Sequence, residues 1–223
     1  TTGDHFGYKV ATSADGKTII VGASNDEIPG SGSDSGVVYV FDRDGNNFNE
    51  VGILTGSHAS DSNDYFGWSI ATSADGKTIV VGNYQDEIPG SGSGSGVVYV
   101  FDRDGNNFNE VGILTGSHAS DSNDYFGSSV ATSADGKTII VGAYIDEIPG
   151  SGSGSGVVYV FNRQGNNFNQ VGILTGTYAS NSFDYFGYSV ATSADGKTIV
   201  VGTRDDEIPG SGSASGVTYV FDQ

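Results

Sequence analysis

The stretch Asp64-Tyr65-Phe66-Gly67-Trp68-Ser69-Ile70-Ala71 decides the fold, because its first four residues recur along the chain at a constant spacing. The pattern Asp-(Tyr/His)-Phe-Gly begins at Asp4, Asp64, Asp124 and Asp184, in steps of 60 residues. Two other motifs, Ser-Ala-Asp-Gly-Lys-Thr and Asp-Glu-Ile-Pro-Gly-Ser-Gly-Ser, recur with the same step. A period of this length indicates an array of similar structural units. We therefore predict a single repeat domain over 1–223, with repeats 4–63, 64–123, 124–183 and 184–223.

Each repeat carries four short strand patterns, which in the first repeat are 6–12, 18–21, 37–41 and 48–55. The second and third are almost entirely apolar, as expected for strands buried on both faces, whereas the fourth is mixed and suits a sheet edge. Asp-Gly pairs after the first and third strands favour tight hairpins. No stretch has a helical period. The sequence predicts an all-β fold, a β-propeller of four-stranded antiparallel blades in which the last blade lacks its outer strand in this chain.

The strands also predict the core and the close contacts of this propeller. Apolar residues of the first three strands are expected to pack between blades, and fixed glycines are expected to allow close approach of strands. The expected core residues are Phe6, Val21, Val38, Val40 and Phe41 with their repeats, and the glycines are Gly7, Gly22 and Gly36.

Three segments of the second repeat resemble the FG-GAP repeat of integrin α subunits and many bacterial surface proteins. They are Phe66-Gly67-Trp68-Ser69-Ile70-Ala71, Val81-Gly82 and Gly96-Val97-Val98-Tyr99-Val100-Phe101. The resemblance implies a propeller and a place outside the cell or at its surface. Integrin-type blades often carry an Asp-x-Asp-x-Asp-Gly calcium loop between the first two strands, where this chain has only Ala14-Asp15-Gly16-Lys17. It also has fewer blades than integrin-like propellers, so a four-bladed ring, part of a larger ring and a ring shared by two chains all stay open.

Composition excludes several classes of function. The 223 residues include 27 acidic and 9 basic residues, which gives a net charge of −18. Nucleic-acid binding requires a basic surface and is not expected. The absence of cysteine excludes disulfides, thiolate catalysis and cysteine-ligated metals. No apolar run is long enough to form a membrane-spanning helix, so membrane insertion is not expected.

The acidic residues gather in two long loops of each repeat, 23–36 and 56–64 in the first, which share one face of a meandering blade. Oxygen-rich loops suit hard cations, and we expect calcium as the ion. Alternatively, the acids anchor turns and keep the protein soluble. The candidate metal ligands are Asp26, Glu27, Asp61, Asp64, Asp86, Glu87, Asp121, Asp124, Asp146, Glu147, Asp184, Asp206 and Glu207.

Positions that differ between the repeats lie on or beside the same long-loop face. Variation on one face of a uniform scaffold is typical of a recognition surface, and exposed aromatic rings suit sugar stacking or a protein contact. Neutral drift in tolerant loops is the alternative. The candidate ligand-binding residues are Tyr8, Trp68, Tyr188, Tyr84, Tyr144, Arg204, His58, His118 and Tyr178.

These observations predict a non-catalytic adhesion or recognition module, extracellular or at the cell surface, with a protein or glycan partner on the long-loop face. No enzyme is expected, because none of the three histidines belongs to a nucleophile motif and four near-identical copies do not supply distinct acid and base environments. A glycan-binding lectin is one alternative. The other is a structural protein that self-associates into filaments through the open edge of the last blade at 217–221.

Overall fold

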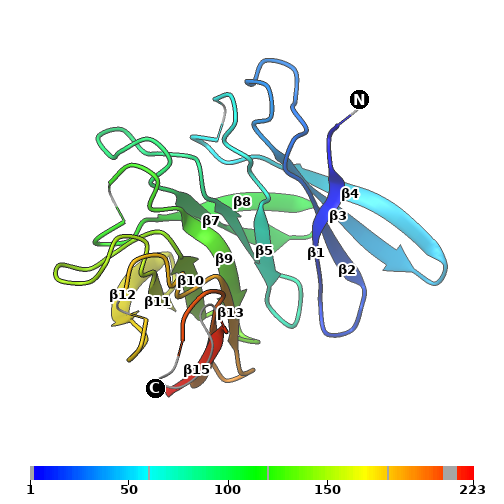
Figure 1. Cartoon of the computed structure of the whole chain (residues 1–223). Helices are drawn as coiled ribbons and strands as arrows, with labels where there is room; N and C mark the ends of the chain where they lie inside the picture. Colours follow the sequence, from blue (N-terminus) through cyan, green and yellow to red (C-terminus); the bar gives the residue numbers. More distant parts are fainter. Residues whose placement is uncertain (1–2, 60, 120, 180, 208–214) are drawn as a thin grey trace.

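The computed structural model describes residues 3–59, 61–119, 121–179, 181–207 and 215–223. These residues form strands, turns and loops and no helix, in four antiparallel sheets that we call blades I to IV (Figure 1). Blade I comprises β1 (Phe6–Thr12), β2 (Thr18–Ala23), β3 (Val37–Asp44) and β4 (Asn47–Leu54). Blade II comprises β5 (Ser69–Thr72), β6 (Thr78–Asn83), β7 (Val97–Asp104) and β8 (Asn107–Leu114). Blade III comprises β9 (Phe126–Thr132), β10 (Thr138–Ala143), β11 (Val157–Gln164) and β12 (Asn167–Leu174). Blade IV comprises β13 (Ser189–Thr192), β14 (Thr198–Thr203) and β15 (Val217–Asp222).

Each blade is a simple meander in which consecutive strands pair with one another. The all-β propeller fold, the four repeats and the three-stranded last blade are therefore as the sequence predicts. The third and fourth strands are paired for longer than expected, because their hairpin continues the ladder as far as Asp44 opposite Asn47. A bulge between Val40 and Phe41 recurs in blades II and III and adds local twist to each third strand.

The hydrophobic core lies between blades. The strand faces of one blade contribute Ile20, Val38 and Val40, and the next blade covers them with a fully buried phenylalanine, Phe66, and with Tyr99. The same arrangement recurs around Phe126 and around Phe186. The predicted core residues Val21, Val38 and Val40 are confirmed, whereas Phe41 is only half-buried. Stability therefore comes mainly from contacts between neighbouring repeats, as in other repeat proteins.

Two of the predicted glycines permit these contacts. Gly36 pairs in a parallel bridge with Phe66 of the next blade, and a side chain at Gly36 would overlap the Phe66 backbone. Gly22 lies against the carbonyl of Gly67, so a methyl group there would also collide with the next blade. A side chain at Gly7 would have open space around it, whereas one at the equivalent Gly67 would collide with Val38.

The four blades follow one another without closing into a ring (Figure 1). Val10 of blade I is 66% exposed and Val220 of blade IV is 65% exposed, so the two terminal sheet faces do not cover each other. The four-bladed ring is therefore not what the described residues form. The prediction that Phe6 is a core residue is wrong for the same reason: Phe6 is 59% exposed because no described blade packs on that side.

Candidate functional site

A tight turn begins each blade and positions aromatic side chains on the long-loop side. In blade II the amide of Trp68 donates to the carbonyl of Tyr65 at 3.1 Å, and Gly67 has a φ of 89°. Positive φ at the third residue is the hallmark of a type II turn, which favours glycine there. The Phe-Gly pair thus turns Phe66 into the core and leaves Tyr65 and Trp68 on the other side.

The tyrosine before each Phe-Gly pair has an unusual backbone conformation. Tyr65, Tyr125 and Tyr185 have φ values of 59°, 59° and 58°. Left-handed geometry is uncommon for bulky residues, and such residues concentrate at functional sites. His5 takes the same place in blade I with a φ of 53°.

These turns and the ends of the second strands together form a continuous set of rings, which we call the aromatic arc. Tyr8 lies 4.7 Å from Trp68, and Trp68 lies 4.5 Å from Tyr84, between ring centroids. Tyr84 lies 5.0 Å from Tyr125 of the next blade, and Tyr125 lies 5.8 Å from Tyr144. The arc continues into blade IV and thus spans all four blades. Its members are Tyr8, Tyr65, Trp68, Tyr84, Tyr125, Tyr144, Tyr185 and Tyr188.

Arg204 ends the arc on blade IV. Its guanidinium lies 4.8 Å from the ring centroid of Tyr185 and 5.5 Å from that of Tyr188, within cation–π range. It also forms an ion pair with Asp205 at 2.7 Å. The structure therefore brings together six of the predicted ligand-binding residues, namely Tyr8, Trp68, Tyr84, Tyr144, Tyr188 and Arg204.

Burial raises the pKa of three phenols of the arc, those of Tyr8, Tyr84 and Tyr144. Desolvation, helped by neighbouring tyrosines, raises the pKa of Tyr144 to about 12, and it raises the pKa of Tyr84 still further. Tyr8 and Tyr188 at the two ends are 44% and 47% exposed. Rings that are uncharged, closely spaced and partly exposed provide faces on which a flat ligand can stack.

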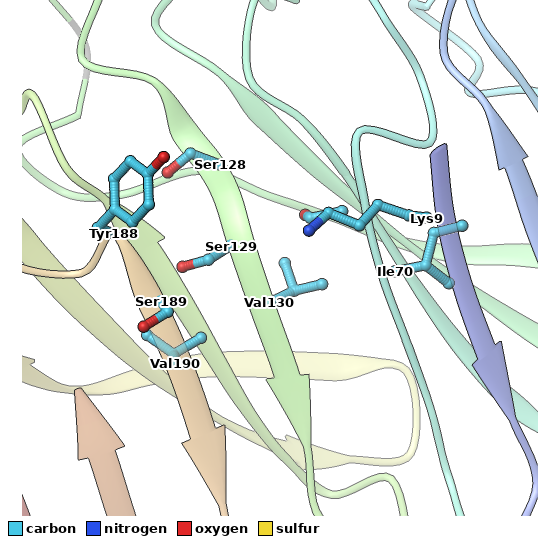
Figure 2. A pocket seen from close by; sticks show the side chains of 9 residues that line it. Lys9, Ile70, Ser128, Ser129, Val130, Tyr188, Ser189 and Val190 are labelled. Atoms are coloured by element: carbon cyan, nitrogen blue, oxygen red, sulfur yellow. The ribbon is translucent and has the colours of Figure 1, made fainter. Parts of the chain in front are cut away.

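A small hollow of about 170 Å³ adjoins the arc between the first strands of the blades. Lys9 of β1 reaches into it from one side and Tyr188 lies at the other, with Ser128 and Ser129 between them (Figure 2). Ser129 donates its hydroxyl to the carbonyl of Gly187 at 2.8 Å and so links blades III and IV. Repeats II, III and IV have serine where blade I has Lys9.

The other three predicted ligand-binding residues lie outside the arc. His58 lines a separate hollow with Asp61, Glu87 and Pro89. His118 is its counterpart in the next repeat. Tyr178 is exposed, and its backbone amide donates a hydrogen bond to the hydroxyl of Tyr219 at 3.1 Å. Conversely, the differences between repeats did not single out Tyr65, Tyr125 and Tyr185, because repeats II, III and IV all have tyrosine there. Their place before the Phe-Gly turn was the available signal.

The first acid of each Asp-Glu pair is held by a tyrosine of its own blade. The Tyr39 hydroxyl donates to Asp26 at 2.5 Å, and the Tyr219 hydroxyl donates to Asp206 at 2.6 Å. The Tyr99–Asp86 and Tyr159–Asp146 bonds repeat this pattern in blades II and III. The second oxygen of Asp86 accepts the amide of Glu87 at 2.8 Å. These carboxylates therefore close the long loop onto β3, β7, β11 and β15.

The aspartate that opens each Asp-Tyr-Phe-Gly motif accepts a backbone hydrogen bond. Asp64 accepts the amide of Asp61 at 2.7 Å, as Asp124 and Asp184 do from residues 121 and 181. Desolvation and the nearby charge of Asp86 raise the pKa of Asp64 to about 7. The pKa of Asp86 is raised to about 6, chiefly by its own burial. Each pair of buried carboxylates is thus electrostatically unfavourable when both are ionised.

The predicted calcium ligands form no metal cage by themselves. Among the described residues, no three histidine or acidic side chains are grouped as metal ligands. Both Asp86 oxygens already accept hydrogen bonds, so the Asp64–Asp86 pair offers few oxygen atoms for an ion that prefers six to eight.

The described part of the chain contains no helix able to cross a membrane. The motif residues 208–214 of blade IV lie outside the described residues.

Comparison with protein families gives a match to the FG-GAP repeat over residues 1–41, 48–101, 108–161 and 169–221. The matched segments cover each of the four blades and most of the chain. The search of curated proteins gives no match.

Proposed function

The chain belongs to the FG-GAP repeat family, and from that membership we propose that it is a recognition module of an extracellular or surface protein whose binding surface is the aromatic arc. FG-GAP repeats form β-propeller modules of the adhesion and recognition type, which are generally non-enzymatic and typical of extracellular or surface proteins. One observation carries the proposal: ring-to-ring contacts run across all four blades, and many of the rings stand where the repeats differ.

The arc suits a carbohydrate ligand in particular. Pyranose rings present C–H faces that stack on Tyr and Trp, and Tyr8 and Tyr188 are partly exposed. A protein partner with a flat epitope is the second possible ligand class, because Tyr and Trp also dominate protein hot spots.

Trp68 provides the test, since it is the only tryptophan of the chain and lies inside the arc. Neutral oligosaccharides that bind on a glycan array are titrated into the protein while its intrinsic fluorescence is recorded. We expect a saturable change in the Trp68 emission. Tyr84→Ala and Tyr144→Ala should weaken binding about 10-fold or more each. Tyr178→Ala, which is outside the arc, should leave it unchanged. An array without hits, or binding insensitive to both arc variants, would rule out the carbohydrate proposal.

Calcium dependence is a separate part of the proposal, suggested by the repeated carboxylate pairs. Burial is the main cause of the raised pKa values of Asp64 and Asp86, and the charge of Asp86 adds to the rise at Asp64. A cation beside the two carboxylates would favour their ionised forms. A calcium-specific rise of the melting midpoint over a chelated sample, absent with magnesium and lost in Asp64→Asn, would support it. Equal midpoints in calcium and chelator would leave these carboxylates with a structural role only.

A further inference from the structure

The two terminal faces of the blade series are complementary, and we propose that blade IV of one molecule receives blade I of a second copy of this chain. This assembly goes beyond ligand recognition by the arc. A second copy fits both faces, because the three interfaces inside the chain show what kind of surface covers each of them. Blade I still displays the covering half, and blade IV still displays the half that is covered.

The apolar half on blade I is already in its docked geometry. Phe6 lies 5.5 Å from Tyr39 and 6.3 Å from Phe41 between ring centroids. The buried counterpart Phe66 lies 5.5 Å from Tyr99 and 6.1 Å from Phe101. The rings thus need no rearrangement to enter an interface. Phe6 is nevertheless 59% exposed, whereas Phe66, Phe126 and Phe186 are fully buried.

The receiving half lies on β14 and β15 of blade IV. Val200, Thr218 and Val220 occupy the places that Ile20, Val38 and Val40 occupy in blade I. Val40 is fully buried by blade II, while Val220 is 65% exposed. Gly216 also preserves the glycine that Gly36 provides for the close approach of Phe66. The surface is therefore of the kind that Phe66 covers in blade I.

An Arg–Asp ion pair marks two of the three internal interfaces, and one half of the same pair lies on each of the two terminal faces. Arg103 of blade II donates to both oxygens of Asp42 in blade I, at 2.6 and 2.5 Å, and to the hydroxyl of Thr18 at 3.2 Å. Arg163 binds Asp102 and Thr78 in the same way between blades III and II. Planar pairing of this kind fixes orientation as well as charge.

Arg43 on blade I is the equivalent of Arg103 and Arg163. Its Nε donates to the carbonyl of Gly45 at 2.9 Å and its guanidinium lies 5.9 Å from the ring of Phe48, as Arg103 does with Gly105 and Phe108. No acidic side chain of the described residues forms an ion pair with Arg43. The arginine is therefore held in the docking pose without its carboxylate.

Asp222 on blade IV is the matching acid. It accepts the hydroxyl of Thr198 at 3.1 Å, much as Asp102 accepts that of Thr78 at 3.4 Å, and it has no basic partner in the part of the chain described. The interface between blades III and IV has Asn162 and Gln223 at these two positions, so both charges are replaced together. In the proposed assembly, Arg43 of one molecule pairs with Asp222 of the second copy.

A backbone ladder ends at the same two faces. The amide of Ala14 donates to the carbonyl of Ala74 at 2.8 Å, that of Ala74 to Ala134 at 2.9 Å, and that of Ala134 to Ala194 at 2.9 Å. A docked second copy would continue the ladder from the Ala194 amide to the Ala14 carbonyl. The interface is heterologous, so it produces a closed ring of copies or an open series according to the rotation that each step adds.

Sedimentation velocity of the 223-residue chain tests the proposal from micromolar to millimolar concentration, in enough salt to screen the net charge of −18. The wild-type chain should sediment faster as concentration rises. Arg43→Asp and Asp222→Arg should each weaken association roughly 10- to 100-fold. An equimolar mixture of the two variants should restore it, because each mismatched residue then meets its complement.

The matched controls make the same charge changes elsewhere: Lys137→Asp in the hairpin of blade III and Asp104→Arg in that of blade II, both exposed. They should associate like the wild-type chain, and unchanged near-ultraviolet circular dichroism should show that all four variants fold. A chain that stays monomeric over the whole range overturns the proposal. Association that both interface variants leave intact also overturns it and points instead to pairing along the edge of β15.

Discussion

The hydroxyl of Tyr99 donates a hydrogen bond to a carboxylate oxygen of Asp86, and both side chains are buried in blade II. The bond joins the middle of the third strand to the loop that follows the second. It also lowers the pKa of Asp86, against the larger opposing effect of burial. The long loop is therefore fixed to the blade by a charge-assisted contact.

Replacing Tyr99 by phenylalanine should lower the free energy of unfolding by about 1–3 kcal/mol, because a buried carboxylate loses a donor. Tyr39→Phe is the matched control: it removes the same bond in blade I, where Asp26 and Tyr39 are only partly buried. Its cost should be about 1 kcal/mol or less. Urea unfolding measures both, and equal losses would show that burial does not set the strength of the bond.

Glycines of the repeats differ in the space that is available for a side chain. Gly96 and Gly105 both have positive φ, at 89° and 62°, but only a side chain at Gly96 would overlap the backbone of Phe126. Gly96→Ala should cost about 3 kcal/mol or more, whereas Gly105→Ala should cost about 1–2 kcal/mol from its backbone conformation alone. Similar midpoints of thermal unfolding for the two variants would contradict the close approach of blades II and III.

Much of this architecture follows from the sequence because the repeat is strict. A period of 60 residues, Asp-Gly hairpins and apolar strands fix blades, strand order and the inter-blade core. Which blades are covered by a neighbour does not follow, because Phe6 and Phe66 lie in the same Asp-x-Phe-Gly motif and have opposite burial. Burial of the phenylalanine depends on a neighbouring blade, which no local pattern encodes.

The candidate site was only partly predictable. Differences between repeats pointed to Tyr8, Trp68 and Tyr84, which the structure joins in one arc. The same reasoning grouped His58 with them, although it lies in another hollow, because a loop's position along the chain does not give its direction in space. Tyr125 bridges Tyr84 and Tyr144, but repeats II and IV also have tyrosine at its position, so differences among these repeats give no signal there.

Stability should fall as the pH rises through neutrality. Asp64 and Asp124 have pKa values raised to about 7, against an ordinary value of 3.8, so the folded chain binds their protons more tightly than the unfolded chain does. A raised carboxyl pKa contributes stability at low pH, and this contribution is lost as the pH passes the folded-state value. The melting midpoint should therefore be several degrees higher at about pH 5.5 than at about pH 8.

The variant Asp64→Asn, combined with Asp124→Asn, should flatten this dependence, because an amide keeps an oxygen for the Asp61 and Asp121 amides and carries no charge. Asp104→Asn, at an exposed hairpin, is the control and should leave the slope unchanged. A melting midpoint that is higher at about pH 8 than at about pH 5.5 would show that the carboxylate pairs are stabilised when ionised, as a bound cation would make them.

Asn83 departs from its repeats in a way that should cost stability. Its side chain is fully buried at the end of β6, and neither its amide nitrogen nor its carbonyl oxygen has a hydrogen-bond partner within the described protein. Blades I and III have Ala23 and Ala143 at this position, both fully buried, so the fold accepts alanine there. Blade IV has Thr203, whose hydroxyl donates to the carbonyl of Val217 at 3.0 Å.

Asn83→Ala should therefore raise the free energy of unfolding by about 1–2 kcal/mol, since it removes an unsatisfied buried amide at a site whose backbone already suits alanine. The reverse change, Ala143→Asn in blade III, should lower it by a similar amount, and urea unfolding of both variants measures the pair. Asn83 directly precedes Tyr84 of the aromatic arc, so a loss of glycan binding in the stabilised variant would show that the buried amide is kept for recognition. A destabilised Asn83→Ala chain would instead show that the amide is hydrogen-bonded through internal water.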